Sequence, residues 1–415
     1  MARIISISSG KGGVGKTTFA INFGLELSKY GKTILIDLDM GTSSVRNHLD
    51  FDIQQDLYHF LKKEVPLENC LHSLPEKLDH AKKYQNFHVI VSPKGFFEDI
   101  VNLNYAYKLK LITAINKLDA DFIILDLRAG LDYRVLDFLP RANTGIVIFT
   151  PLVPAADYSA TELVVALVVR RLRRLFSRSS PIYRNYSPKY FYLFNDLLGR
   201  IEDVYDNSLI NFDDFLYQIK EAIGEGPVTH YVEGILHSFR AYYVLNQFNG
   251  LEQTIEKVVK PLSDSIKRRV STFVQLINLG WIVYDELIME ASIKKIPALI
   301  LKKDPIKIAD KADDPFKRLE GIRRSYLTEA IKQPKPFEIK AKKAVQETKI
   351  DPLLNAQLEI LQVMFDESRK EQDFRKNFDY ITRHSLYIMK NYPYYAFGDR
   401  LLSLMVPEID GGVRT

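Results

Sequence analysis

Cysteine is nearly absent from this chain of 415 residues, in which Cys70 is the single thiol. One cysteine excludes a disulfide within the chain, and it also excludes a metal cluster built from several thiolates. The eight histidines are no substitute, because they are scattered without the close spacing that a zinc site needs. The sequence therefore does not predict redox or zinc chemistry within one chain.

Long apolar runs are also missing. No stretch of about 18 apolar residues without charge occurs, which argues against a membrane-spanning helix. The N-terminus passes through Ala2 and Arg3 straight into an apolar run, without the basic head and small-residue cleavage site of a signal peptide. We therefore expect a cytoplasmic protein, with peripheral binding at the inner face of the membrane as a further possibility.

Acidic side chains are missing from one window only. The net charge of +5 is small for this length, so the total charge does not indicate nucleic-acid binding. Between Leu163 and Asn195, however, there is no Asp or Glu. The basic residues of this window are Arg170, Arg171, Arg173, Arg174, Arg178, Arg184 and Lys189.

Short β-branched runs recur along the chain, separated by stretches long enough for a crossover helix. This alternation predicts an α/β fold with a mainly parallel sheet and helices on both faces. Most of the runs are apolar throughout, as strands buried on both faces are. The predicted strands are Arg3–Ser8, Thr33–Asp37, His88–Ser92, Phe122–Asp126, Gly145–Thr150, Ala241–Asn246, Trp281–Tyr284 and Ala298–Leu301.

Two additions accompany the predicted core, which we assign to residues 1–176 and 241–325. Residues 177–240 read as a mostly helical insertion. Its clearest helix is Asp213–Ile223, which is followed by the helix breakers Gly224, Gly226 and Pro227. Residues 326–350 contain Lys and Pro and read as a linker, and residues 351–415 read as a helical C-terminal extension.

The strongest motif follows the first predicted strand and opens a predicted helix. Its glycines let consecutive backbone N–H groups surround a di- or triphosphate, and the helix N-terminus adds the positive end of its dipole. Lys16 is expected to neutralise the β- and γ-phosphates, and the Thr17 hydroxyl to ligate Mg²⁺. The candidate nucleotide-binding residues are Gly10, Lys11, Gly12, Gly13, Val14, Gly15, Lys16, Thr17 and Thr18.

Carboxylates stand at the ends of two further predicted strands, where the ligands of a parallel sheet gather. Asp37 and Asp39 end the second strand, and Asp126 ends the fourth. The alternative for each is an aspartate that caps the following turn. Together with the loop, these residues supply the phosphate, metal and water positions that phosphoryl transfer needs.

Lys11, near the start of the loop, is similar to the signature lysine of the deviant Walker A ATPases, the MinD/ParA family. The resemblance implies a P-loop sheet, ATP and Mg²⁺ as cofactors, ATP hydrolysis, and an ATP-bound homodimer in which Lys11 reaches the partner's nucleotide. It also implies that Lys11, Lys16 and Asp39 are catalytic, with Asp39 orienting the attacking water. Thr17, Asp37 and Asp126 are then the metal residues, with Asp37 supporting the hydrated Mg²⁺ and Asp126 in its outer shell.

The resemblance continues beyond the loop, and in spacing it is nearest to the MinD and FlhG branch. Residues 145–158 resemble the family's strand ending in Thr-Pro, and 279–286 its L-G-x-I-x-x-D segment. Asn246 corresponds to the asparagine that contacts adenine in that family. Asn195 also follows an aromatic run, but Asn246 fits the downstream spacing better. The insertion and the C-terminal extension resemble no family that we recognise.

The resemblance predicts an ATP-dependent dimerising switch that controls the positioning or assembly of a cellular structure. The alternative is a ParA-like partitioning ATPase that binds DNA nonspecifically through the basic window. Two segments are candidates for contact with an anionic membrane or an acidic protein partner. One is the arginine-dense helix Leu163–Arg178, whose pattern is more typical of a core helix with a solvated basic face. The other is Phe397–Val406, whose apolar face is more typical of core packing.

Overall fold

One sheet organises the fold, and its strands follow the order β3-β4-β2-β5-β1-β6-β7-β8. Neighbouring strands run parallel except for β3, which is antiparallel to β4. The predicted mainly parallel α/β sheet is confirmed. The strand bounds are β1 (Arg3–Ser8), β2 (Thr33–Asp37), β3 (His72–Ser73), β4 (Phe87–Ile90), β5 (Phe122–Asp126), β6 (Asn143–Phe149), β7 (Arg240–Phe248) and β8 (Gln275–Val283).

The structure is a computed structural model that describes residues 2–41, 44–50, 52–130, 136–140, 143–150, 156–177, 180, 188–248, 258–301, 373–393, 397–398 and 401. These residues belong to one compact unit, which joins Met1–Leu301 to Phe365–Thr415. The predicted linker, most of the predicted C-terminal extension, and residues 151–155 of the Thr-Pro segment lie outside the described residues.

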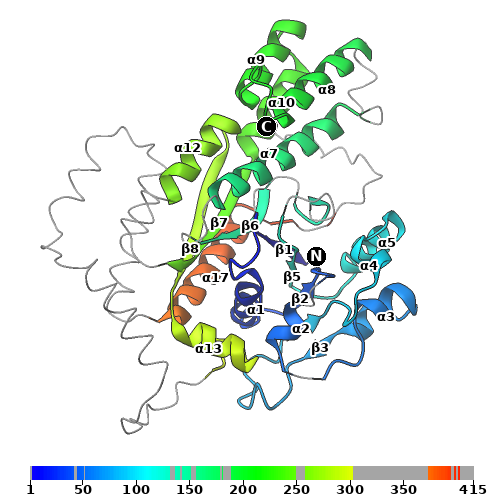
Figure 1. Ribbon diagram of the computed structural model, residues 1–415, viewed down its shortest axis with the longest axis vertical. Coiled ribbons are helices and arrows are strands. Elements are labelled where there is room, and N and C mark those ends of the chain that lie inside the picture. Colours follow the sequence, from blue (N-terminus) through cyan, green and yellow to red (C-terminus); the bar gives the residue numbers. More distant parts are fainter. Residues whose placement is uncertain are drawn as a thin grey trace, which may run out of the picture. The chain divides into compact units, whose positions relative to one another are not determined.

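Helices cover both faces of the sheet, as the sequence predicts (Figure 1). Because crossovers between parallel strands are right-handed, connections that run in opposite directions along the sheet lie on opposite faces. The helices are α1 (Lys16–Leu27), α2 (Ser44–His48), α3 (Leu57–Lys62), η1 (Leu67–Cys70), α4 (Glu98–Val101), α5 (Tyr105–Ile115), α7 (Ala156–Leu175), α8 (Pro188–Glu202), α9 (Phe212–Ile223), α10 (Pro227–Ser238), α12 (Lys260–Arg269), α13 (Glu286–Lys294) and α17 (Phe374–Asn391).

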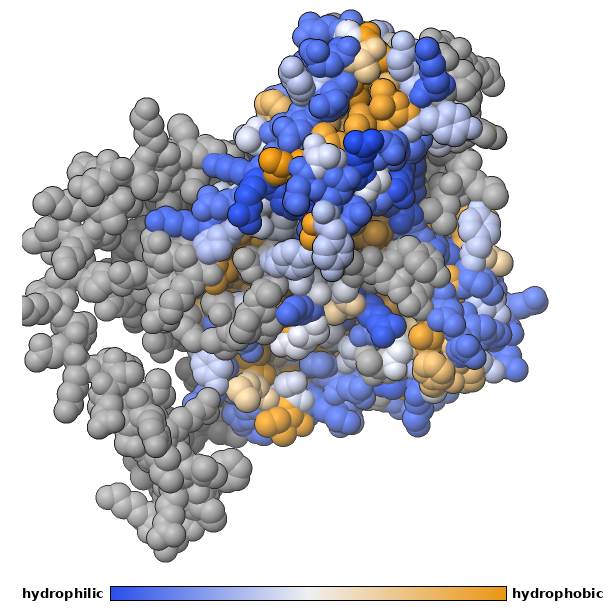
Figure 2. Space-filling view, turned by 45° about the horizontal axis from the view of Figure 1, so that its top comes forward, coloured by the Kyte–Doolittle hydropathy of each residue, from blue (hydrophilic) through white to orange (hydrophobic). Residues whose placement is uncertain are grey.

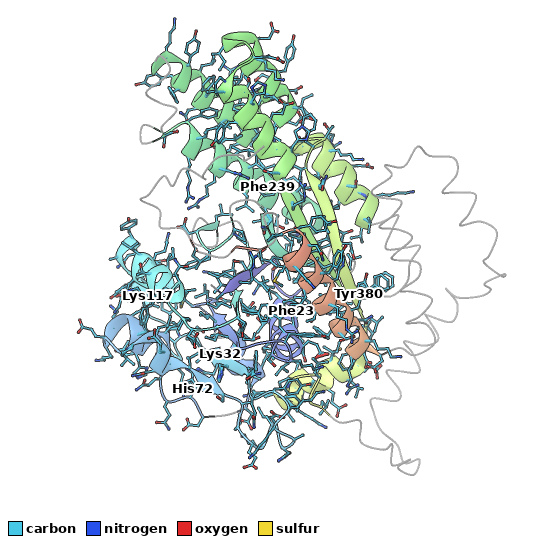
Figure 3. The ribbon with its side chains drawn as sticks, turned by 180° about the vertical axis from the view of Figure 1, so that it is seen from behind. Phe23, Lys32, His72, Lys117, Phe239 and Tyr380 are labelled. Atoms are coloured by element: carbon cyan, nitrogen blue, oxygen red, sulfur yellow. The ribbon has the colours of Figure 1, made fainter. Side chains whose placement is uncertain are left out.

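Two helices from opposite ends of the sequence share one face of the sheet. The rings of Phe19 in α1 and Phe378 in α17 lie 5.9 Å apart, and both are buried. In Figure 3, Phe23 is labelled on α1 and Tyr380 on α17. Helix α17 is thus part of the α/β core, because it packs against both β8 and α1.

One predicted strand is wrong. Ala298–Leu301 forms a helical turn, in which the N–H groups of Ile300 and Leu301 donate to the carbonyl oxygen of Pro297 (2.9 and 3.1 Å). Its apolar residues are buried by packing, and periodicity cannot distinguish a strand from a turn in so short a run. The short strand β3 was not predicted from the sequence. β8 begins at Gln275, well before the predicted start at Trp281, because polar Asn278 and Gly280 interrupt its apolar pattern.

Three helices between β6 and β7, α8 to α10, form what we call the helical lobe (residues 188–238). Its core is aromatic: Phe176, which follows α7, lies 4.7 Å from Phe194 and 6.2 Å from Phe215 between ring centroids. Gly224, with φ 74°, ends α9, and α10 then starts at Pro227. Phe239, labelled in Figure 3, is fully buried where the lobe returns to β7. Figure 2 shows mainly hydrophilic residues over the lobe, with hydrophobic ones between them.

The segment after α17 packs into the core at its described positions. Phe397 is buried against Tyr242, with 5.2 Å between ring centroids, and Ile4 N–H donates to the Gly398 carbonyl (2.6 Å). Leu401 is also buried, and it exchanges two hydrogen bonds with the Asn116 side chain (2.7 and 2.8 Å). Phe397 and Leu401 therefore pack internally; Leu404 and Met405 lie outside the described residues. No described helix has the length and apolar character to cross a membrane.

Candidate active site

The loop between β1 and α1 has the shape that its glycines predict. Gly13 and Gly15 have φ angles of 78° and 83°, in the left-handed region that favours glycine. Gly15 stands immediately before α1, and its carbonyl accepts the first helical hydrogen bond from Phe19 N–H (2.9 Å). Lys11, Gly12 and Gly13 are exposed. The loop can therefore present its backbone N–H groups to an anion at the helix N-terminus.

Three of the predicted residues meet at one carboxylate. Lys16 Nζ lies 2.8 Å from one oxygen of Asp126, and the Thr17 hydroxyl donates to the other oxygen (2.7 Å). All three side chains are buried. Because Asp126 is fully enclosed at the carboxyl end of β5, its charge requires such partners. The geometry therefore joins the start of α1 to the end of β5.

A second carboxylate stands beside Asp126. Asp37 is its register partner across β2 and β5, and it is also fully buried. It accepts hydrogen bonds from Asp39 N–H (3.0 Å), Val45 N–H (3.0 Å) and the Ser92 hydroxyl (2.9 Å). Burial, and next the neighbouring charge of Asp126, raise the pKa of Asp37 from 3.8 to about 7, although its three donors act in the opposite direction.

This carboxylate pair fits a divalent cation. Two buried carboxylates with one lysine, which bonds Asp126, are short of positive charge, and the Thr17 hydroxyl adds an oxygen ligand. The described residues contain no group of three or more His, Cys, Asp or Glu side chains that could hold a metal alone. Mg²⁺ needs no such group, because it commonly takes one or two protein ligands, waters and substrate phosphates.

Asp39 is buried beside this site, whereas Lys11 is exposed. Asp39 is 9% exposed, and one of its oxygens accepts a hydrogen bond from the Ser44 hydroxyl (3.2 Å). Lys11 is exposed at the mouth of the loop, and its carbonyl accepts from Ser9 Oγ (2.8 Å). A Cβ on Gly10 would lie 2.3 Å from Ser159 Cβ, which shows how closely α7 packs on the loop.

Of the two candidate asparagines, Asn246 lies at the loop and Asn195 does not. Asn246 stands near the end of β7, and its Nδ2 donates to the Val14 carbonyl (2.8 Å). Asn195 is exposed on α8, where its side chain donates to the Phe191 carbonyl (2.8 Å). Val14 and Thr18, the remaining loop residues, are buried and half-buried. Asn246 supports the loop backbone, and its expected contact with adenine stays a prediction.

The sequence did not predict three side chains that contact the predicted site residues Asp37, Asp39 and Thr18. Ser92 follows β4 and donates to Asp37, and Ser44 begins α2 and donates to Asp39. His48, at the end of α2, contacts Thr18 with 3.3 Å between Nε2 and Oγ1. Ser92 had a usable signal, since it follows a strand at the carboxyl edge of the sheet. Ser44 and His48 had none, because only the position of α2 brings them here.

The basic window has a different environment from the one that its composition suggests. Arg170 pairs with Asp137, which also pairs with Lys108, and Arg173 pairs with Glu202 of the helical lobe. Burial, and next the charge of Arg174, lower the pKa of Arg170 to about 10, so it remains a cation at pH 7. Several of these arginines therefore serve internal contacts. Residues 178–179 and 181–187 lie outside the described residues.

Comparisons with known proteins agree with the motifs. Residues 2–164 match the family model described as an AAA domain. The putative septum site-determining protein MinD of Guillardia theta is 29% identical over 184 residues, which is 44% of this chain and 65% of that protein. The chloroplastic MinD homologue of Arabidopsis thaliana is 31% identical over 157 residues, 37% of this chain and 47% of that protein.

A solved structure, MinD from Pyrococcus horikoshii complexed with Mg-ADP, shares 17% identity with a TM-score of 0.42, over 72% of this chain and 88% of that one. This chain spans between 48% and 65% of the length of the first curated relatives that it matches. The loop between β1 and α1, with its carboxylates on β2 and β5, defines a P-loop nucleotide-binding domain. Residues 2–164 belong to the P-loop ATPase domains of the MinD/ParA type.

Proposed function

We propose that this chain is a Mg·ATP-dependent dimerising switch that hydrolyses ATP to ADP and phosphate. The observation that carries the proposal is the convergence of Lys16, Thr17 and Asp126, with Asp37 beside them, behind a loop shaped for phosphates. Such a site neutralises phosphate charge and holds a metal, which is what phosphoryl transfer mainly requires.

Each residue of the site has a distinct part in this proposal. The loop N–H groups and Lys16 bind the phosphates, and Thr17 with the carboxylates Asp37 and Asp126 holds the metal region. Bound Mg²⁺ supplies charge neutralisation at the phosphate oxygens. Asp39 orients the attacking water; its backbone N–H donates to Asp37, and its carboxylate accepts a hydrogen bond from the Ser44 hydroxyl.

Two substitutions test the binding and hydrolytic parts separately. Lys16→Ala should lose tight ATP binding, because Lys11, the other lysine of the loop, is assigned to the partner's nucleotide and does not replace its charge. Asp39→Ala should bind ATP, dimerise and fail to hydrolyse it. Gel filtration with ATP and a phosphate-release assay measure both, and wild-type hydrolysis by Asp39→Ala would show that its assignment is wrong.

Dimerisation is proposed from Lys11, which is exposed at the loop mouth and stands where the family's cross-subunit lysine stands. Lys11→Ala should bind nucleotide but lose ATPase activity. When Lys11→Ala is mixed with Asp39→Ala, the Lys11→Ala subunit of a mixed dimer keeps its own Asp39 and receives Lys11 from its partner, so activity should return at one of the two sites. The absence of any recovery on mixing would mean that Lys11 acts within its own subunit.

The cellular role that we propose is control of the positioning or assembly of a cellular structure. Its support is the similarity to proteins named for septum-site determination. The proposal includes binding to a partner protein and peripheral binding to an anionic membrane. The helical lobe belongs to the insertion, which resembles no family that we recognise. Sedimentation with phosphatidylglycerol vesicles, with and without ATP, tests membrane binding directly.

The alternative is ATP-dependent nonspecific DNA binding through the basic window. Arg170 and Arg173 already pair with carboxylates, which leaves less free positive charge than the sequence suggested. The helical lobe, moreover, contains three Lys/Arg against nine Asp/Glu, so it repels a phosphate backbone. Retention on duplex DNA that requires ATP and falls steeply with salt would favour this alternative over the first.

A further inference from the structure

The short helix α2 follows the Asp37–Asp39 segment and is fixed by side chains on three sides. Val45 N–H donates to Asp37 (3.0 Å), and the Ser44 hydroxyl donates to Asp39 (3.2 Å). On another side, Arg46 contacts Asp56 and the Ser92 carbonyl (2.8 and 3.3 Å). A helix of this length has little stability by itself, so these contacts determine where it lies.

The third side is a bridge from α2 to α1, the helix that follows the nucleotide loop. His48 Nδ1 lies 2.8 Å from the Ser44 carbonyl oxygen, and Nε2 lies 3.3 Å from the Thr18 hydroxyl. A carbonyl can only accept, so Nδ1 must carry the proton. In the neutral ring Nε2 is then an acceptor, and the Thr18 hydroxyl donates to it. The two bonds thus fix both the tautomer and the orientation of the ring.

We propose that His48 is a positioning residue that fixes the Asp39 carboxylate relative to the nucleotide loop. Thr18 holds His48, His48 holds the Ser44 backbone, and the Ser44 hydroxyl holds Asp39. This chain of bonds connects α1, which carries Lys16 and Thr17, with the proposed water-orienting carboxylate. The inference rests on the proposed ATPase function, in which a displaced carboxylate slows hydrolysis while the phosphate-binding residues are unchanged.

The test compares two substitutions of His48. His48→Gln keeps an amide that can donate to the Ser44 carbonyl and accept from Thr18, whereas His48→Leu fills similar space without either bond. His48→Leu should lower kcat by about tenfold or more, with ATP affinity within about twofold of wild type. His48→Gln should stay within about threefold of the wild-type kcat.

A second link in the same chain gives an independent check. Ser44→Ala removes the hydroxyl that reaches Asp39 and leaves the His48 bridge in place, so it should also lower kcat. Both residues act on one carboxylate, so their effects should not add. The kcat of the double variant His48→Leu/Ser44→Ala should therefore lie within about twofold of the lower of the two single-variant kcat values. His72→Leu is the matched control: His72 also bonds a backbone carbonyl (2.6 Å), but on β3 at the far edge of the sheet (Figure 3).

Hydrogen–deuterium exchange provides a readout that needs no hydrolysis. In His48→Leu, residues 44–48 should exchange about tenfold faster than in wild type, because α2 has lost its bond to α1. Exchange within α1 should remain unchanged, since its own helical hydrogen bonds are intact. His72→Leu should change neither segment.

The outcomes separate this inference from the proposed function. Wild-type kcat in His48→Leu, or unchanged exchange in residues 44–48, would overturn the positioning role. Equal losses in His48→Gln and His48→Leu would overturn the hydrogen-bond assignment. A wild-type protein that hydrolyses no ATP would instead refute the proposed function, and the exchange measurement would still decide whether His48 holds α2.

Discussion

The side-chain amide of Asn246 donates a 2.8 Å hydrogen bond to the backbone carbonyl of Val14, which ties the end of β7 to the nucleotide loop. The same amide closes the space above Gly15, where an added Cβ would lie 2.2 Å from Nδ2. Gly15 is therefore required for two reasons: its left-handed φ of 83° and the proximity of Asn246.

Gly15→Ala is expected to destabilise the nucleotide-free protein. The left-handed backbone costs about 1 kcal/mol for a residue with a Cβ, and displacement of Asn246 adds to that cost. Asn246→Ala in the same chain removes the clash, so the double variant should be more stable than the sum of the single effects predicts. Thermal unfolding of the four proteins measures this coupling. Strict additivity would mean that the two residues do not meet in solution.

In metal-free protein, stability should fall as the pH rises through the range set by Asp37. Its pKa is about 7 in the folded protein and near 3.8 when unfolded, so between these values the folded state binds more protons. The free energy of unfolding therefore decreases with pH across this window, on the order of 1 kcal/mol per pH unit. Below the lower value the stabilisation is fully present, and above about pH 7 it is lost.

Urea unfolding in EDTA at pH 5 and pH 8 measures this slope. Asp37→Asn carries no titrating group at this position, so its stability should depend less on pH than that of wild type. Equal slopes in the two proteins would show that Asp37 is not the group responsible.

Arg170→Gln should lower the free energy of unfolding by about 2 kcal/mol. Its partner Asp137 is buried and keeps Lys108, so the loss is smaller than for a buried carboxylate left without any cation. Arg173→Gln is the control, since its pair with Glu202 is largely exposed and should contribute less than about 0.5 kcal/mol. Similar effects of the two substitutions in chemical denaturation would contradict the pairing of Arg170 with the buried carboxylate of Asp137.

Phe397→Ala should destabilise the folded protein by about 3 kcal/mol, the usual cost of truncating a fully buried phenylalanine. Its ring packs on Tyr242 within the core. Binding to anionic vesicles, measured on folded protein, should not depend on this side chain. A variant of unchanged stability with weaker vesicle binding would favour the membrane helix that the sequence also allowed for this segment.

Local sequence determined the parts of the fold whose signals are contained in a few neighbouring residues. Three strands, Arg3–Ser8, Thr33–Asp37 and Phe122–Asp126, have the bounds that their apolar runs predict. The start of α1 follows from the loop glycines, and the left-handed conformation of Gly15 explains why glycine is needed there. Asp37 and Asp126 could also be placed together, because parallel strands bring their carboxyl ends to one edge.

Tertiary structure decided everything that depends on which segments meet. The window with seven basic residues is a candidate cationic surface by its sequence, but Asp137 and Glu202, from other segments, pair with Arg170 and Arg173. The C-terminal helix reads as an extension, yet α17 packs on α1 and β8. His48 carries no motif, and only the position of α2 against α1 brings its ring to Thr18. Backbone conformation and strand burial are local properties, which a sequence pattern records; ion pairs and side-chain bridges require a partner that the pattern of one segment does not contain.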